Sequence, residues 1–143
     1  MQSVVRRALA TAAAAAVVAV AGGQSSASAS TEFAPDYFRI CVDQACTMSV
    51  SGDITWGNRT ARVAGDVVNK VPGAITMVHW DAFAGSTKVD SATSYVPYPN
   101  QAVVAPYDFN LGDPLLPGGI DRIRIQICSS PTRCSVQWNE IRD

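Results

Sequence analysis

The sequence predicts an all-β protein, an immunoglobulin-like antiparallel β-sandwich of about seven to nine short strands. Three observations lead to this fold. Apolar and polar residues alternate with a period of two in several stretches. Turn-forming residues separate these stretches at intervals of about ten residues, and no stretch beyond residue 29 keeps the apolar period of a helix. A small closed barrel is the alternative architecture.

The alternation is clearest near the two ends of the predicted domain. Ile123, Ile125 and Ile127 alternate with two arginines and a glutamine, and residues 37–42 alternate in the same way. A period of two is typical of a strand with one buried face. Further strands are predicted at residues 48–56, 60–68, 74–84, 87–95, 102–110 and 135–141.

Turn-forming residues divide these strands. Glycine and proline either allow or impose the backbone angles of tight turns. The predicted turns are Ser51-Gly52-Asp53, Gly57-Asn58, Pro72-Gly73, Gly85-Ser86, residues 97–100 and Pro117-Gly118-Gly119. The short strands between these turns would pair into two sheets, and Trp80, on a central strand, would lie in the core between them.

Residues 1–29 are predicted to be a cleaved secretory signal peptide. Two arginines, Arg6 and Arg7, precede a run of mostly alanine from Ala8 to Ala21, which is too short and too weakly apolar to span a bilayer. Cleavage is expected after Ala29, with Ala21 and Ala27 as alternatives, and general secretory export is favoured over the twin-arginine route. The protein would then be extracellular, without stable membrane insertion.

The remainder is expected to be a disordered lead-in at residues 30–36 and a single domain at residues 37–143. Loss of Arg6 and Arg7 leaves 9 of the 11 basic residues against 12 acidic ones, a net charge of −3. Nucleic-acid binding depends on clustered Lys and Arg, so we expect no nucleic-acid partner. We expect a monomer.

Four cysteines, Cys41, Cys46, Cys128 and Cys134, lie in the predicted domain. An even number in an exported chain predicts two disulfides rather than a zinc site. Four cysteines allow three connectivities. Local pairing, 41 with 46 and 128 with 134, is favoured because each pair flanks a turn between strand-like segments, although a bridge between the two ends would restrict the unfolded chain more.

The sequence predicts no catalytic residue, no metal and no cofactor. The single histidine, His79, lies two residues before Asp81, so the two share a strand face, but no motif places a nucleophilic serine. Asp108, Asn110 and Asp113 loosely match a calcium loop, but the glutamate of such a loop is absent and a turn is favoured. We therefore expect a non-enzymatic protein, with a hydrolase using His79 as a remote alternative.

Four residues are candidates for ligand binding. Tyr95 and Tyr98 lie among prolines that stiffen their loop, and Phe83 and His79 lie on the solvent face of a strand. Together they would form a patch for a sugar or an apolar molecule. The alternative interpretation is that the tyrosines merely cover one end of the sandwich.

The sequence resembles known secreted proteins in its two cysteine hairpins and in the segments Trp56–Gly65 and Pro117–Cys128. Over nearly the whole mature chain, the sequence resembles small secreted actinobacterial proteins, a group to which no activity is attached. More distantly, its architecture and its two hairpins resemble neocarzinostatin-type chromophore-binding apoproteins, exported sandwiches that hold an apolar enediyne in a cleft. This second resemblance carries over no individual site residue.

Binding is therefore the leading functional hypothesis, with a protein, a sugar or a small apolar molecule as the ligand. The first alternative is a structural or envelope-associated protein without a small ligand. A cleft lined by Trp, Tyr and Phe would favour a small ligand. If those aromatic residues instead fill the core of the sandwich, the small-ligand hypothesis fails.

Overall fold

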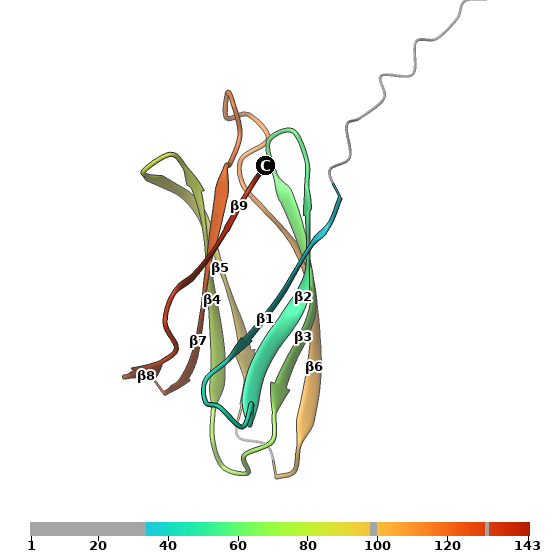
Figure 1. The fold of residues 1–143 in the computed structure, drawn as a ribbon, viewed down its shortest axis with the longest axis vertical. Helices are drawn as coiled ribbons and strands as arrows, with labels where there is room; N and C mark the ends of the chain where they lie inside the picture. The colour runs from blue at the N-terminus through green and yellow to red at the C-terminus, as the bar shows by residue number, and fades with distance from the viewer. Residues whose placement is uncertain (1–33, 98–99, 131) are drawn as a thin grey trace, which may run out of the picture.

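The computed structural model describes residues 34–97, 100–130 and 132–143, and these form two facing sheets without any helix (Figure 1). The strands are β1 (Asp36–Cys41), β2 (Met48–Trp56), β3 (Ala61–Asn69), β4 (Thr76–Ala84), β5 (Thr87–Val96), β6 (Val103–Leu111), β7 (Arg122–Ser130), β8 (Arg133–Cys134) and β9 (Trp138–Ile141). The predicted signal peptide lies outside the described residues. β1 begins at Asp36, the last residue of the predicted lead-in.

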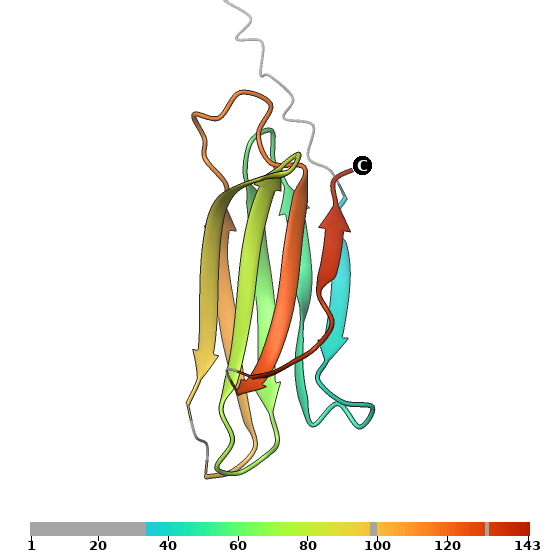
Figure 2. The same ribbon diagram turned by 90° about the vertical axis from the view of Figure 1, so that its left-hand side faces the viewer.

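Each sheet is antiparallel, and the chain crosses between the sheets three times. One sheet has the order β1-β2-β3-β6, and the other has the order β5-β4-β7, with β8 and β9 pairing along the far side of β7. The crossings are β3 to β4, β5 to β6 and β6 to β7 (Figure 2). This arrangement is an antiparallel β-sandwich, as the sequence predicted, but its strand order differs from the ABED and CFG sheets of immunoglobulin domains.

The predicted alternation matches the buried faces of the central strands. Ile123, Ile125 and Ile127 of β7 have no exposed surface, and neither have Val78 and Trp80 of β4. β4 and β7 pair directly, so these side chains form one continuous apolar layer against the other sheet. Burial of such a layer is the main force that holds the two sheets together.

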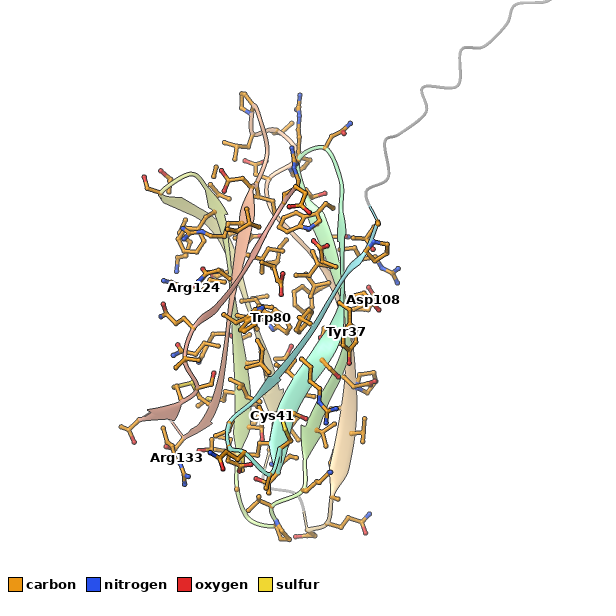
Figure 3. All side chains as sticks on the ribbon, viewed as in Figure 1. Tyr37, Cys41, Trp80, Asp108, Arg124 and Arg133 are labelled. Carbon is orange, nitrogen blue, oxygen red and sulfur yellow. A yellow bond between two sulfur atoms is a disulfide. The ribbon has the colours of Figure 1, made fainter. Side chains whose placement is uncertain are left out.

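An aromatic cluster fills the middle of the core. The Trp80 ring centroid lies 5.8 Å from that of Phe38, 5.0 Å from that of Tyr107 and 5.5 Å from that of Phe109. Trp80 lies between the sheets in Figure 3. Trp56 is also buried, and its indole N–H donates a hydrogen bond of 2.6 Å to Asp36. The rings around Trp80 therefore fill the sandwich and do not line a cleft, so the small-ligand hypothesis fails in the form that required an aromatic cleft.

The predicted turn at Ser51-Gly52-Asp53 was wrong, because Gly52 lies inside β2. It pairs with Gly65 of β3. A Cβ atom would lie 2.3 Å from the Ala64 carbonyl oxygen at Gly52 and 2.1 Å from the Ser51 carbonyl oxygen at Gly65. Glycine is needed at both positions for this close approach, which is a recognised role of glycine within a strand.

One predicted strand is shorter than expected. Residues 135–141 were expected to form a single strand, but within this range only β9, from Trp138 to Ile141, forms, and β8 ends before Ser135. The Ser135 hydroxyl accepts a hydrogen bond of 3.2 Å from the Ile127 N–H. A side chain thus takes the place of a backbone partner at this point, and the regular ladder along β7 is interrupted.

Candidate functional site

Both disulfides lie at the same end of the sandwich, the lower end in Figure 1. Cys41–Cys46 closes the turn between β1 and β2, and Cys128–Cys134 closes the turn between β7 and β8. The predicted local pairing is confirmed. Each bridge joins residues of one sheet, so neither links the two sheets.

The first disulfide turn is held by Asp43 and Thr47. The Thr47 N–H donates a hydrogen bond of 3.1 Å to one carboxylate oxygen of Asp43, and the Thr47 hydroxyl donates a second hydrogen bond to the other oxygen. These bonds, the side-chain one first, hold the pKa of Asp43 below its ordinary value, and Arg133 adds a smaller coulombic effect in the same direction. Both oxygens of Asp43 are therefore engaged within its own turn.

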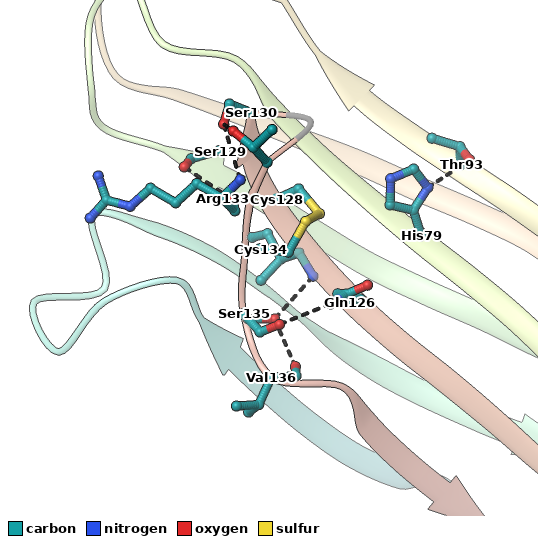
Figure 4. Close-up of a disulfide and its surroundings, with 12 residues drawn as sticks. His79, Thr93, Gln126, Cys128, Ser129, Ser130, Arg133, Cys134, Ser135 and Val136 are labelled. Carbon is teal, nitrogen blue, oxygen red and sulfur yellow. Dashed lines mark hydrogen bonds between the residues drawn. A yellow bond between two sulfur atoms is a disulfide. The ribbon is translucent and has the colours of Figure 1, made fainter.

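The second disulfide turn fixes the backbone of Arg133 (Figure 4). The Arg133 N–H donates a hydrogen bond of 3.1 Å to the Ser130 hydroxyl, and the Arg133 carbonyl accepts a hydrogen bond of 3.3 Å from the Ser129 hydroxyl. Cys134 follows directly and is bridged to Cys128. The side chain of Arg133 extends away from this bridge, and within the described residues no hydrogen bond or ion pair engages its guanidinium.

A third loop, between β3 and β4, is organised by Asn69. This residue is fully buried. Its side-chain amide donates a hydrogen bond of 2.9 Å to the Ala74 carbonyl, and its side-chain oxygen accepts a hydrogen bond of 2.9 Å from the Val71 N–H. The Lys70 N–H donates 2.8 Å to the Thr47 carbonyl. The loop is thus attached to the first disulfide turn.

These three loops line a half-open pocket of about 320 Å³, which we call the inter-bridge pocket. Four apolar side chains and five polar or charged ones line it: Val42, Met48, Val71 and Ala74, and Asp43, Thr47, Ser129, Ser130 and Arg133. Asp43 comes from the sheet of β1 and Arg133 from the sheet of β7, so the pocket spans the gap between the sheets. In Figure 3, Cys41 and Arg133 are both labelled at this end.

A smaller cavity, of about 240 Å³, lies beside Asp36, Trp56 and Asp143. Asp36 is already the acceptor for the Trp56 indole, and the polar side chains lining the cavity include no cation. The inter-bridge pocket therefore has the more varied chemistry of the two.

Among the three described residues of the predicted patch, Phe83 lies apart from His79 and Tyr95. Tyr95 is 51% exposed and pairs with Met77 of β4, whereas Phe83 lies six residues further along that strand. At about 3.3 Å per residue, six residues separate the two ends of the patch by about 20 Å. His79 lies near the Tyr95 end, opposite Thr93. Tyr98 lies outside the described residues.

The expectation that Phe83 is exposed was wrong, since 7% of its surface is accessible. The guanidinium carbons of Arg122 and Arg124 lie 4.3 and 4.9 Å from its ring centroid and cover it. Arg124 also bonds to Asp81 at 2.7 Å, and Lys88 lies 3.3 Å from the other oxygen of Asp81. Phe83 is thus part of a packed, charged layer on the outer face of its sheet.

His79 is not in a catalytic arrangement. Its Nδ1 lies 3.3 Å from the hydroxyl of Thr93, and within the described residues it has no hydrogen bond to a serine or a carboxylate. Asp81, on the same face, is bound by Arg124 and Lys88 instead. Among the described residues, His79 is therefore not paired with a nucleophile or an acid, as the hydrolase alternative would require.

The loose match to a calcium loop is explained by an ion pair. Asp108 lies on β6 and bonds to Arg62 at 2.5 Å. Within residues 34–97, 100–130 and 132–143, no three acidic, histidine or cysteine side chains are grouped to hold a metal ion. The described part of the chain also has no helix of the length and apolarity needed to cross a membrane.

Comparisons with protein family models, curated proteins and solved structures give no match to this chain. Sequence reasoning missed the inter-bridge pocket, although it identified the cysteines beside it. The missing information was the topology, which brings turns separated by more than 80 residues to one end of the fold.

Proposed function

We propose that this protein is a secreted, non-enzymatic binding protein that holds a small organic molecule in the inter-bridge pocket. The observation that carries the proposal is the pocket itself, a cavity of about 320 Å³ between two covalently closed turns. Small-molecule sites typically have about 300–1,000 Å³ and combine an apolar lining with a few polar groups. This pocket has both properties.

The walls of the pocket are preformed. Each disulfide restricts one turn, and the third loop is attached through the side chain of Asn69 and through Lys70. A wall that is ordered before binding does not lose its conformational freedom when the ligand enters. This arrangement supports a binding role for the end of the fold that carries the bridges.

Secretion is supported by the cysteines together with the predicted signal peptide. All four cysteines are bridged, and disulfides persist mainly outside the reducing cytosol. The same bridges remove the thiol nucleophiles that a cysteine hydrolase would need. These features favour a binding protein over an enzyme.

A titration with N-phenyl-1-naphthylamine, a neutral apolar dye that fluoresces when it leaves water, tests the proposal. We expect saturable binding of one dye molecule to the full secreted chain. Ala74→Leu places a larger side chain in the pocket and should weaken binding at least tenfold. Ala102→Leu adds the same atoms at an exposed position outside the pocket and should leave binding unchanged.

Two results would overturn the proposal. One is the absence of saturable dye binding to a chain whose thermal unfolding is cooperative. The other is equal binding by the wild type and Ala74→Leu, since that would place the dye elsewhere. Either result would favour the structural, envelope-associated alternative.

A further inference from the structure

We infer that the inter-bridge pocket selects an amphipathic organic anion, with its acidic group bound by Arg133 and its apolar body against Val42, Met48, Val71 and Ala74. This inference rests on the proposed function, because it specifies the ligand class of the same pocket. A carboxylate or a sulfonate would offer the same oxygen acceptors with a single negative charge.

Arg133 supplies the anion-binding group. Its backbone is fixed by Ser129, Ser130 and the neighbouring bridge, whereas its guanidinium has no hydrogen-bond or ion-pair partner in the described part of the chain. A guanidinium carries five N–H donors in a planar fork that matches the spacing of two acid oxygens. Its base is thus held in place while its donors are available.

The serines of the same turn do not compete for the ligand. Ser129 donates to the Arg133 carbonyl, and Ser130 accepts from the Arg133 N–H and shares a contact of 3.4 Å with Thr132. Their hydroxyls therefore position Arg133, and we assign them a positioning role. Recognition of the charge is left to the guanidinium.

Asp43 limits the charge that the pocket accepts. Its carboxylate lines the same cavity, and its interaction with Arg133 is coulombic, without a direct ion pair. Thr47 occupies both of its oxygens, so Asp43 stays ionised and does not move to cap the guanidinium. A single negative charge can lie against the guanidinium of Arg133, whereas any further charge would lie nearer to Asp43 and be repelled by it.

The apolar side of the pocket excludes simple inorganic ions as the main ligand. Met48 is buried, and Val42, Val71 and Ala74 are half-buried around it. An ion such as phosphate would leave this surface in contact with water. A ligand with both an apolar body and an acidic group would cover the surface and satisfy Arg133 together.

The test compares two dyes that differ by one charged group. 8-Anilinonaphthalene-1-sulfonate carries a sulfonate, and N-phenyl-1-naphthylamine has the same rings without it. We expect the wild type to bind the sulfonate about tenfold more tightly, the size of one hydrogen-bonded charge interaction. Arg133→Gln should remove this preference and leave the neutral dye unaffected.

Arg39→Gln is the matched control. Arg39 is likewise exposed, but it lies on the outer face of β1, away from the pocket. This variant should bind both dyes as the wild type does. Raising the salt concentration from roughly 20 to 500 mM shortens the screening length. This change should weaken binding of the sulfonate dye and leave binding of the neutral dye unchanged.

The possible outcomes distinguish a failure of the proposed ligand class from a failure of the proposed function. If both dyes bind equally and Arg133→Gln changes neither, the anionic ligand class is wrong, while sensitivity to Ala74→Leu would keep the pocket as a binding site. If neither dye responds to Ala74→Leu, the proposed function itself fails. A loss of both dyes in Arg133→Gln with unchanged thermal unfolding would also contradict the assigned role of Arg133.

Discussion

The phenol of Tyr107 on β6 donates a hydrogen bond of 2.8 Å to the carbonyl oxygen of Ser51 on β2, two strands away in the same sheet. The side chain passes over β3 at Gly65, where no side chain obstructs it. Three strands are thereby joined by one residue. The same ring contacts Trp80, so the arrangement also ties this sheet to the core.

Replacing Tyr107 with phenylalanine should lower the free energy of unfolding by about 1 kcal/mol at pH 7, the usual value of one hydrogen bond. Burial raises the pKa of Tyr107 above its ordinary value, and Asp66 and Asp53 raise it further. The folded state therefore favours the neutral phenol. This contribution is present below about pH 10 and is lost as the pH rises above that value.

Urea unfolding at several pH values checks this prediction. The difference in stability between the wild type and Tyr107→Phe should shrink as the pH rises above about 10. Tyr95→Phe is the control because Tyr95 is exposed. A constant difference across this range would show that the phenol has the same environment in the folded and unfolded states.

Gly65→Ala should destabilise the protein by roughly 3 kcal/mol, at the upper end of the cost of overpacking. The new Cβ atom would lie 2.1 Å from the Ser51 carbonyl oxygen and 2.7 Å from the Tyr107 hydroxyl. Backbone has to move to relieve the first of these contacts. Ala64→Ser, at the adjacent position of β3, should change the urea midpoint little. Equal midpoints for both variants would contradict the close approach.

Asp81→Asn should destabilise the protein by about 1 kcal/mol at neutral pH, as expected for a partly exposed ion pair. Partial burial raises the pKa of Asp81, but the hydrogen bonds from Arg124 and Lys88 outweigh this effect, so the net pKa is lowered. A lowered pKa in the folded state means that the contribution is present above about pH 4 and is lost as the pH falls.

Thermal unfolding of the wild type and Asp81→Asn between pH 7 and pH 2 gives the measurement. The two unfolding temperatures should converge at the acid end. Asp53→Asn serves as a comparison, since Asp53 is exposed on the other sheet. Convergence for Asp53→Asn as well would mean that the acid effect is not specific to the Asp81 ion pairs.

Removal of either disulfide, with both of its cysteines changed to serine, should cost about 2 kcal/mol, the chain-entropy value for so short a loop. The sandwich should remain folded, because neither bridge joins the sheets. The free energy of dye binding should decrease much more than the free energy of unfolding does. Near-ultraviolet circular dichroism, which reports on Trp80 and its neighbours, would reveal an unexpected loss of the core.

The parts of the fold that could be predicted are those in which one strand face carries the signal. Ile123, Ile125 and Ile127 follow a period of two, and their burial depends on that period alone. Gly52 was misread because a glycine between two polar residues is typical of a turn. Its role depends on Gly65 and Tyr107, which are distant in the sequence.

The candidate site depends even more on distant residues. Phe83 was predicted to be exposed because it shares a strand face with His79 and Asp81, but two arginines of β7 cover it. Asp43, Asn69 and Arg133 belong to three separate turns. Nothing in their local sequence indicates that the three turns meet. A pocket of this kind follows from the order of the strands, which periodicity alone does not determine.

The placement of the bridges has a consequence for when the protein becomes competent. Hydrophobic packing around Trp80 assembles the sandwich without sulfur chemistry, whereas the turns that carry Asp43 and Arg133 are closed by it. In a reducing compartment the same chain would form its core but leave these turns open. Under the proposed binding function, capture of a ligand would then begin only where thiols are oxidised.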